Sequence, residues 1–235
     1  MNILDYFIIA VLGLSTIIGI YQGFVVAILN IASFFISWLT AFLLYPVLAH
    51  YLQTTTKIVS TLLYYTEAST KIPGIEYRNA AITAIPAEKM NEIVQNANFP
   101  IPFESILHNN IINQAFKQSG LTTLGDYFNH TIVNVIINIL SFLVIYLVIR
   151  ILLSWIISMT DTVTHLPVLK HFNSLLGGGF GLFRGIFAIF IIFSIVPVLL
   201  TVIPIDLKTM FLDKSLFAAF FYKSNIITNI INGII

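Results

Sequence analysis

The chain has 235 residues, of which 58% are hydrophobic and only 9% are charged, and its formal net charge is +1. Soluble domains carry about 25% charged residues, so this composition, with a mean hydropathy of +0.95, indicates an integral membrane protein. The small net charge argues against nucleic acid as a partner. The absence of cysteine excludes disulfides, thiolate nucleophiles and cysteine-based metal sites.

Two apolar segments at the start of the chain predict a membrane hairpin. Residues 4–20 are just long enough to cross a bilayer, and residues 24–44 follow after a turn that contains Gly23. Asp5 stands at the start of the first segment, where a carboxylate suits the positive end of a helix. This start is acidic and has no small-residue cleavage site, so we interpret it as a retained span and not as a signal peptide. Pro46 is expected to kink or end the second span.

Residues 53–129 differ from the segments on either side because they hold about half of the acidic and basic side chains. Proline and glycine at 73–74 and two prolines at 100–102 interrupt this region. We interpret it as an extramembrane insert of two to four short helices, too small for a large independent core.

Residues 132–157 and 180–203 predict a second membrane hairpin, with Pro197 expected to kink its second span. An arginine inside a span is costly unless it reaches the interface or finds a partner. For Arg150, three interpretations stay open: snorkelling to the interface, an interior ion pair, and a functional charge. Histidines in the loop between these spans match no zinc signature, so we expect no metal site.

Glycines recur at every fourth position where the last span begins, namely at Gly177, Gly181 and Gly185. On a helix they lie on nearly one face, which is the small-xxx-small pattern of close helix contact in membranes, here a glycine zipper. The run lacks the lysine and serine or threonine of a phosphate-binding loop. Two partners stay open for this face: the first span, through Gly13 and Gly19, or a second copy of the chain.

The tail, residues 205–235, has apolar side chains that are expected to lie flat in the membrane interface. These residues are Leu212, Leu216, Phe217, Phe220 and Phe221. A fifth span is the less favoured alternative. Arg150, Lys170 and Arg184 border the loop between the last two spans, which favours a cytoplasmic position for that loop.

The chain resembles a known family in two places. The first is residues 1–5 together with residues 19–24, and the second is residues 172–185. Their Asp-led span, glycine hairpin and Asn-x-x-x-Gly-Gly-x-x-Gly-x-x-Arg-Gly segment are similar to those of the colicin V production protein family of bacterial inner-membrane proteins. Residues 213–216 resemble a short serine-containing stretch of that family, whereas Gln22 replaces a basic residue that is frequent in its first turn. The resemblance implies a role in producing or exporting a peptide toxin, or in envelope homeostasis, and it brings no catalytic residues.

We therefore predict an all-α polytopic membrane protein of about four transmembrane helices, with a small helical insert and an amphipathic C-terminal tail. The expected segments are a hairpin (1–52), the insert (53–129), a second hairpin (130–204) and the tail (205–235). The residues expected to matter for helix packing are Gly13, Gly19, Gly23, Gly177, Gly181 and Gly185, and the membrane charges are Asp5, Arg150 and Arg184. None of these residues is expected to be catalytic or to bind a cofactor or metal.

No nucleophile with an adjacent base is evident, so the sequence favours a non-enzymatic accessory or scaffold factor in the bacterial inner membrane. Polar stripes along residues 30–40 and 134–141 support an alternative, a small oligomeric channel or transporter subunit. The expected partners are the lipid bilayer and either further copies of the chain or an envelope or export protein. In a third, weaker hypothesis, the insert is the module that binds an envelope partner.

Overall fold

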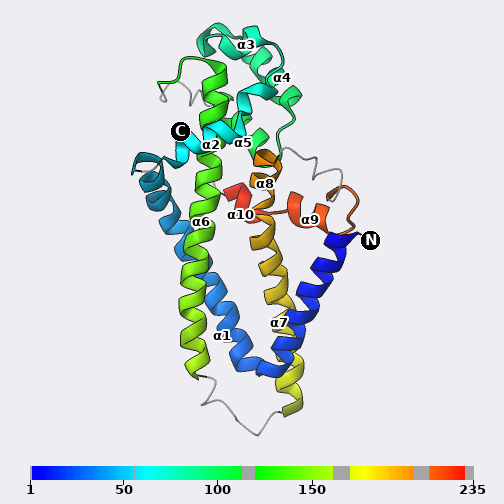
Figure 1. Cartoon of the computed structure of the whole chain (residues 1–235). Helices are drawn as coiled ribbons and strands as arrows, with labels where there is room; N and C mark the ends of the chain where they lie inside the picture. Colours follow the sequence, from blue (N-terminus) through cyan, green and yellow to red (C-terminus); the bar gives the residue numbers. More distant parts are fainter. Residues whose placement is uncertain (1, 56, 113–119, 161–169, 204–211, 231–235) are drawn as a thin grey trace. The chain divides into compact units, whose positions relative to one another are not determined.

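The computed structural model describes residues 2–55, 57–112, 120–160, 170–203 and 212–230 (Figure 1). These residues are almost entirely helical, and among them there is no β-strand, only an isolated bridge between Ala81 and Thr123. The chain divides into two compact units. Unit 1 comprises Met1–Tyr45, Phe142–Ser194 and Leu207–Asn225, and unit 2 comprises Pro46–Ser141, Ile195–Asp206 and Ile226–Ile235.

Helix α1, Ile3–Thr55, contains both of the first two predicted spans. At Gly23 the backbone leaves the helical region, with φ 76° and ψ 175°, and α1 folds back on itself there (Figure 1). A positive φ of this size suits glycine, which has no Cβ atom to clash. The predicted turn is therefore a single-residue bend. Of the two outcomes expected at Pro46, a kink or an end, the structure excludes the end, since α1 continues through Pro46 to Thr55.

Two further long helices follow, α6, Leu124–Thr160, and α7, Lys170–Phe193. After α7 the helix is interrupted at Ser194 and Ile195 and resumes as α8, Val196–Val202, so that the predicted kink lies just before Pro197. Proline is readily accepted in the first turn of a helix, where its missing N–H is not needed.

Three helical segments in the described part of the chain are long and apolar enough to cross a membrane: Ile3–Thr55, Leu124–Met159 and Asn173–Val202. The first of them has two arms, residues 3–22 and 24–55. At 1.5 Å per residue, the shorter arm is about 30 Å long, which is the thickness of a bilayer's hydrocarbon core. The prediction of an all-α polytopic membrane protein is confirmed.

In the described part of the insert, which leaves out residues 56 and 113–119, there are four short α-helices and two 3₁₀ turns. The helices are α2, Ile58–Thr66; α3, Ile75–Asn79; α4, Ala87–Ala97; and α5, Phe103–Ile112. The 3₁₀ turns are Ala68–Lys71 and Ile82–Ala84. Phe103 and Leu107 of α5, and Tyr127 and Phe128 of α6, have no exposed surface. Unit 2 therefore builds its core from the short helices together with the first turns of α6.

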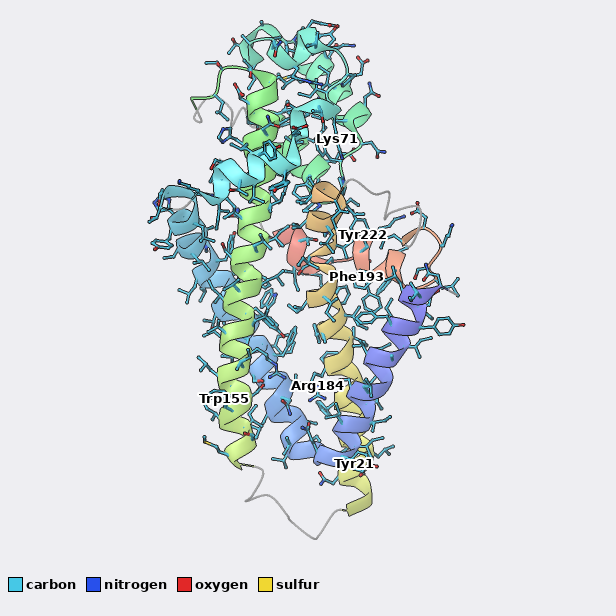
Figure 2. The ribbon with its side chains drawn as sticks, viewed as in Figure 1. Tyr21, Lys71, Trp155, Arg184, Phe193 and Tyr222 are labelled. Carbon is cyan, nitrogen blue, oxygen red and sulfur yellow. The ribbon has the colours of Figure 1, made fainter. Side chains whose placement is uncertain are left out.

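The tail contains α9, Ala218–Lys223, and α10, Ile226–Ile230, which are far too short to be a fifth span. Within unit 1, α9 packs on α7, where the ring centroids of Phe190 and Phe221 are 5.1 Å apart. Leu212 and Phe221 are buried, whereas Leu216, Phe217 and Phe220 remain exposed. Figure 2 labels Phe193 and Tyr222 in this region.

Candidate functional site

The first arm of α1 and the N-terminal half of α7 touch backbone to backbone in unit 1. A Cβ atom at Gly19 would overlap the carbonyl oxygen of Gly177 and lie 2.8 Å from the Cα atom of Gly181. A Cβ atom at Gly181 would in turn overlap the carbonyl oxygen of Ser15. Glycine is the only residue that permits this approach, which is the small-residue contact expected between membrane helices.

The contact extends to Gly23 and Gly185 but leaves out Gly13. At Gly185 a Cβ atom would lie 3.0 Å from the Cβ atom of Ser15. Gly13 faces open space, with no atom within 4 Å of a Cβ placed there, so it takes no part in this contact between α1 and α7. The partner of the glycine face is the first arm of the same chain.

Hydrogen bonds join the two helices at both ends of this contact. The hydroxyl of Ser15 donates to the carbonyl oxygen of Gly181 at 2.7 Å, and this bond is buried. Near the bend of α1, the backbone N–H of Phe24 donates to Asn173 Oδ1 at 2.7 Å. The side chain of Ser174 donates to the carbonyl oxygen of Ile20 at 3.0 Å. The start of α7 is thereby fixed against the bend.

Arg184 projects from α7 (Figure 2) toward polar groups of α1. Its Nε atom donates to Ser15 Oγ at 3.3 Å, and its Nη1 atom donates to Gln22 Oε1 at 3.3 Å. The same Gln22 oxygen accepts a bond from Asn30 Nδ2 at 3.2 Å. A chain of hydrogen bonds thus runs from α7 through both arms of α1.

Arg150 of α6 completes this network from the other side. It donates to Asn30 Oδ1 at 3.3 Å and to the hydroxyl of Ser33. Among the described residues the expected interior ion pair of Arg150 is absent, and neutral oxygens hold its charge between the helices. Within the described residues, the salt bridge present is the one between Lys89 and Glu92 in the insert.

Asp5, at the other end of the first arm, has no exposed surface and binds the tail. Its Oδ1 atom accepts bonds from the hydroxyl of Ser215 at 2.6 Å, and from the backbone N–H groups of Leu216 at 2.8 Å and Phe217 at 3.1 Å. Its Oδ2 atom accepts the N–H of Asn2 at 2.7 Å. The sequence placed Asp5 correctly at a helix start but gave no sign that the carboxylate would hold the tail.

Several polar side chains that sequence patterns singled out bond within their own helix or unit. Ser33 and Ser37 donate to backbone carbonyls in the preceding turn of α1. Asn134 Oδ1 accepts a 3.2 Å bond from Gln53 Nε2 in unit 2. Among the described residues there is no group of three metal-binding side chains. The loop histidine His165 lies outside the described residues.

Comparison with known proteins identifies the family. The family described as Colicin V production protein matches residues 4–86 and 116–225, which is most of the chain. The chain belongs to this family. Membership supports a role in toxin production, and the resemblance found from the glycine and Asp-led motifs is confirmed. No curated protein and no solved structure gives a significant match.

Proposed function

We propose that this family member is a non-enzymatic integral protein of the bacterial inner membrane that assists toxin production or export as an accessory or scaffold factor. The observation that carries the proposal is the family match over residues 4–86 and 116–225. A wider role in envelope homeostasis is part of the same proposal.

The chemistry of unit 1 supports an accessory role over catalysis. Asp5 is fully buried and accepts hydrogen bonds from the tail, while Arg150 and Arg184 donate hydrogen bonds to neutral side chains. Acid–base catalysis needs a titratable group within reach of a substrate proton. In unit 1 the Asp5 carboxylate serves a contact within the protein, which supports a structural role for it over acid–base catalysis.

A deletion strain that carries a colicin V determinant tests the proposal. Deleting the gene should reduce secreted toxin activity while toxin synthesis continues, and the intact gene should restore secretion. The Gly181→Leu variant should fail to restore it because of its backbone overlap, whereas Gly179→Leu, at a position with open space, should succeed. Undiminished secretion in the deletion strain would contradict the proposal.

A small oligomeric channel or transporter subunit is the second candidate. Asn30, Ser33 and Ser37 are buried polar residues on one arm of α1, and two of them contact Arg150. Polar and ionisable side chains inside membrane segments commonly mark pathways for ions or solutes. This arrangement favours anions, because the charge at its centre is positive.

Purified protein in liposomes distinguishes the two candidates. A channel would show chloride or small-anion flux that falls when Arg150 is replaced by glutamine. A scaffold would show no flux above that of protein-free liposomes while still restoring secretion in cells. The distinction also bears on partners: a channel of this size needs further copies of the chain, whereas a scaffold binds an envelope or export protein.

A further inference from the structure

Two arginines in unit 1 belong to one hydrogen-bonded network, and no acidic side chain among the described residues pairs with either of them. Arg184 from α7 and Arg150 from α6 are linked by a chain of hydrogen bonds through Gln22 and Asn30, and both side chains carry a positive charge. Both side chains are half-buried. Within the part of the chain that the structure describes, neither has a carboxylate oxygen within 4.0 Å.

The neutral partners do not use up the donors of this pair. A guanidinium has five N–H groups in a fixed planar fork. Arg150 forms two hydrogen bonds and Arg184 forms three, several of them at 3.3 Å or longer. Each arginine thus keeps N–H groups and a full positive charge for a further acceptor.

Leaving two like charges half-buried among apolar helices is unfavourable, and a bound anion would offset that cost. Paired arginine forks are suited to the oxygens of a phosphate group, which accept parallel hydrogen bonds. Gln22 and Asn30 hold the two forks together through their side-chain oxygens. The ligand class that fits this arrangement best is a phosphate-bearing anion.

The position along the helices agrees with a lipid source for that phosphate. Gln22 directly precedes the Gly23 bend, where α1 turns back and the membrane-crossing arm of residues 3–22 ends. The arginine side chains are long enough to extend toward this end of the bundle. Basic pockets between helices near the membrane surface are known to bind anionic headgroups.

We propose that Arg150 and Arg184, held together by Gln22 and Asn30, form a binding site for the phosphate group of an anionic phospholipid. The site is distinct from the accessory role proposed above and does not depend on it. Free phosphate shares the same chemistry and is separated from lipid by the test.

The test uses the full-length protein purified in a neutral detergent and measures its melting temperature as ligand is added. Three additions are compared: phosphatidylglycerol, phosphatidylcholine and inorganic phosphate. Phosphatidylglycerol should raise the melting temperature of the intact protein, whereas phosphatidylcholine should not. A rise of equal size with inorganic phosphate would assign the site to free phosphate, which still supports the pair as a phosphate site.

Variants show whether the arginines are responsible. The double variant Arg150→Gln with Arg184→Gln should lose the shift, or bind phosphatidylglycerol about tenfold more weakly or worse. Lys214→Gln, which removes an exposed charge from the tail, should keep the shift. Arg150→Gln alone should weaken binding and provides the same test if the double variant does not fold. The proposal is overturned if neither phosphatidylglycerol nor inorganic phosphate raises the melting temperature of the intact protein. It is also overturned if the arginine variants respond to these ligands as the intact protein does.

Discussion

The two ends of the first arm of α1 differ in how their buried or half-buried charges are hydrogen-bonded. At one end, Asp5 accepts four hydrogen bonds of 2.6 to 3.1 Å, three of them from the tail. At the other end, Arg184 donates to neutral oxygens at 3.3 to 3.5 Å, and Arg150 donates to Asn30 Oδ1 at 3.3 Å and to the hydroxyl of Ser33. The first site is complete within the chain, and the second has donors left over.

This difference separates a structural charge from a binding charge. Short bonds to a fully buried carboxylate fix the tail, and removing the carboxylate would leave three donors without their acceptor. Hydrogen bonds from the half-buried arginines to neutral oxygens place the positive charges without neutralising them. We expect the first end to be sensitive to mutation because it stabilises the fold, and the second because it binds something.

The glycine contact between α7 and α1 places Arg184 beside the first arm of α1, so both ends of that arm depend on it. Gly181→Leu is expected to have the largest effect, because its side chain overlaps the backbone at Ser15 and cannot be relieved by a rotamer change. The cost should reach about 3 kcal/mol or more, the upper range for overpacking. Fluorescence-detected size-exclusion chromatography should show little monodisperse protein. Gly179→Leu, on the same helix with open space, is the control; equal loss in both variants would contradict the contact.

Removing the carboxylate that holds the tail should have the next largest effect. Asp5→Ala leaves the hydroxyl of Ser215 and the N–H groups of Leu216 and Phe217 without their acceptor. The tail should detach more often, and trypsin should cleave after Lys214 about tenfold faster. Asp213→Ala removes an exposed carboxylate from the same segment and should leave cleavage unchanged. If Asp5→Ala shows no faster cleavage, the carboxylate does not hold the tail.

Removing one arginine should have a much smaller effect on stability than removing Asp5. In detergent without phospholipid, Arg150→Gln gives up two hydrogen bonds but also removes a half-buried charge of the same sign as that of Arg184. These changes oppose each other, and the free energy of unfolding should change by less than about 1 kcal/mol. Thermal unfolding followed by tryptophan fluorescence measures this. A large destabilisation would mean that Arg150 is structural and would remove the contrast between the two ends.

The smallest effect is expected at the exposed ion pair of the insert. Lys89 Nζ lies 2.8 Å from Glu92 Oε2, and this hydrogen bond raises the pKa of Lys89 above its ordinary value of 10.5. The pair therefore stabilises the fold below the ordinary pKa and ceases to do so as the pH rises through the folded-state pKa. Glu92→Gln should lower the pKa of Lys89 without a measurable change in melting temperature. Titration of the lysine by NMR measures the first effect, and an unchanged pKa would contradict it.

Much of the fold could be predicted from the sequence because membrane segments reveal themselves by length and hydropathy. The four predicted spans fall in α1, α6, and α7 with α8. The exact bounds could not be predicted, because apolar residues continue past each predicted end. α1 extends past Pro46 and α6 begins at Leu124, where packing in unit 2 extends the helix beyond the apolar stretch.

The candidate site was partly predictable. The fourfold spacing of Gly177, Gly181 and Gly185 indicated a close helix contact, and Arg150 and Arg184 stood out as charges in apolar segments. The partners of these arginines could not be predicted, because Gln22 and Asn30 become neighbours only when α1 folds back at Gly23. The bond between Asp5 and Ser215 joins residues 210 positions apart, and no local pattern reports such a pairing.

The most direct test of the central claim, that α1 and α7 of one chain pack backbone to backbone, is a disulfide. The chain has no native cysteine. A Cβ atom at Gly178 would lie 2.8 Å from the Cγ1 atom of Ile20, so Ile20→Cys with Gly178→Cys brings a sulfur into bonding range. Gly13→Cys with Gly178→Cys is the control, because Gly13 faces open space.

Mild oxidation in native membranes, followed by non-reducing electrophoresis, gives the answer. We predict rapid formation of an internal disulfide in the Ile20→Cys, Gly178→Cys protein, seen as a monomer with altered mobility, and none in the control. A cross-linked dimer in place of the internal disulfide would show that the glycine face of α7 meets a second copy, and would contradict the account.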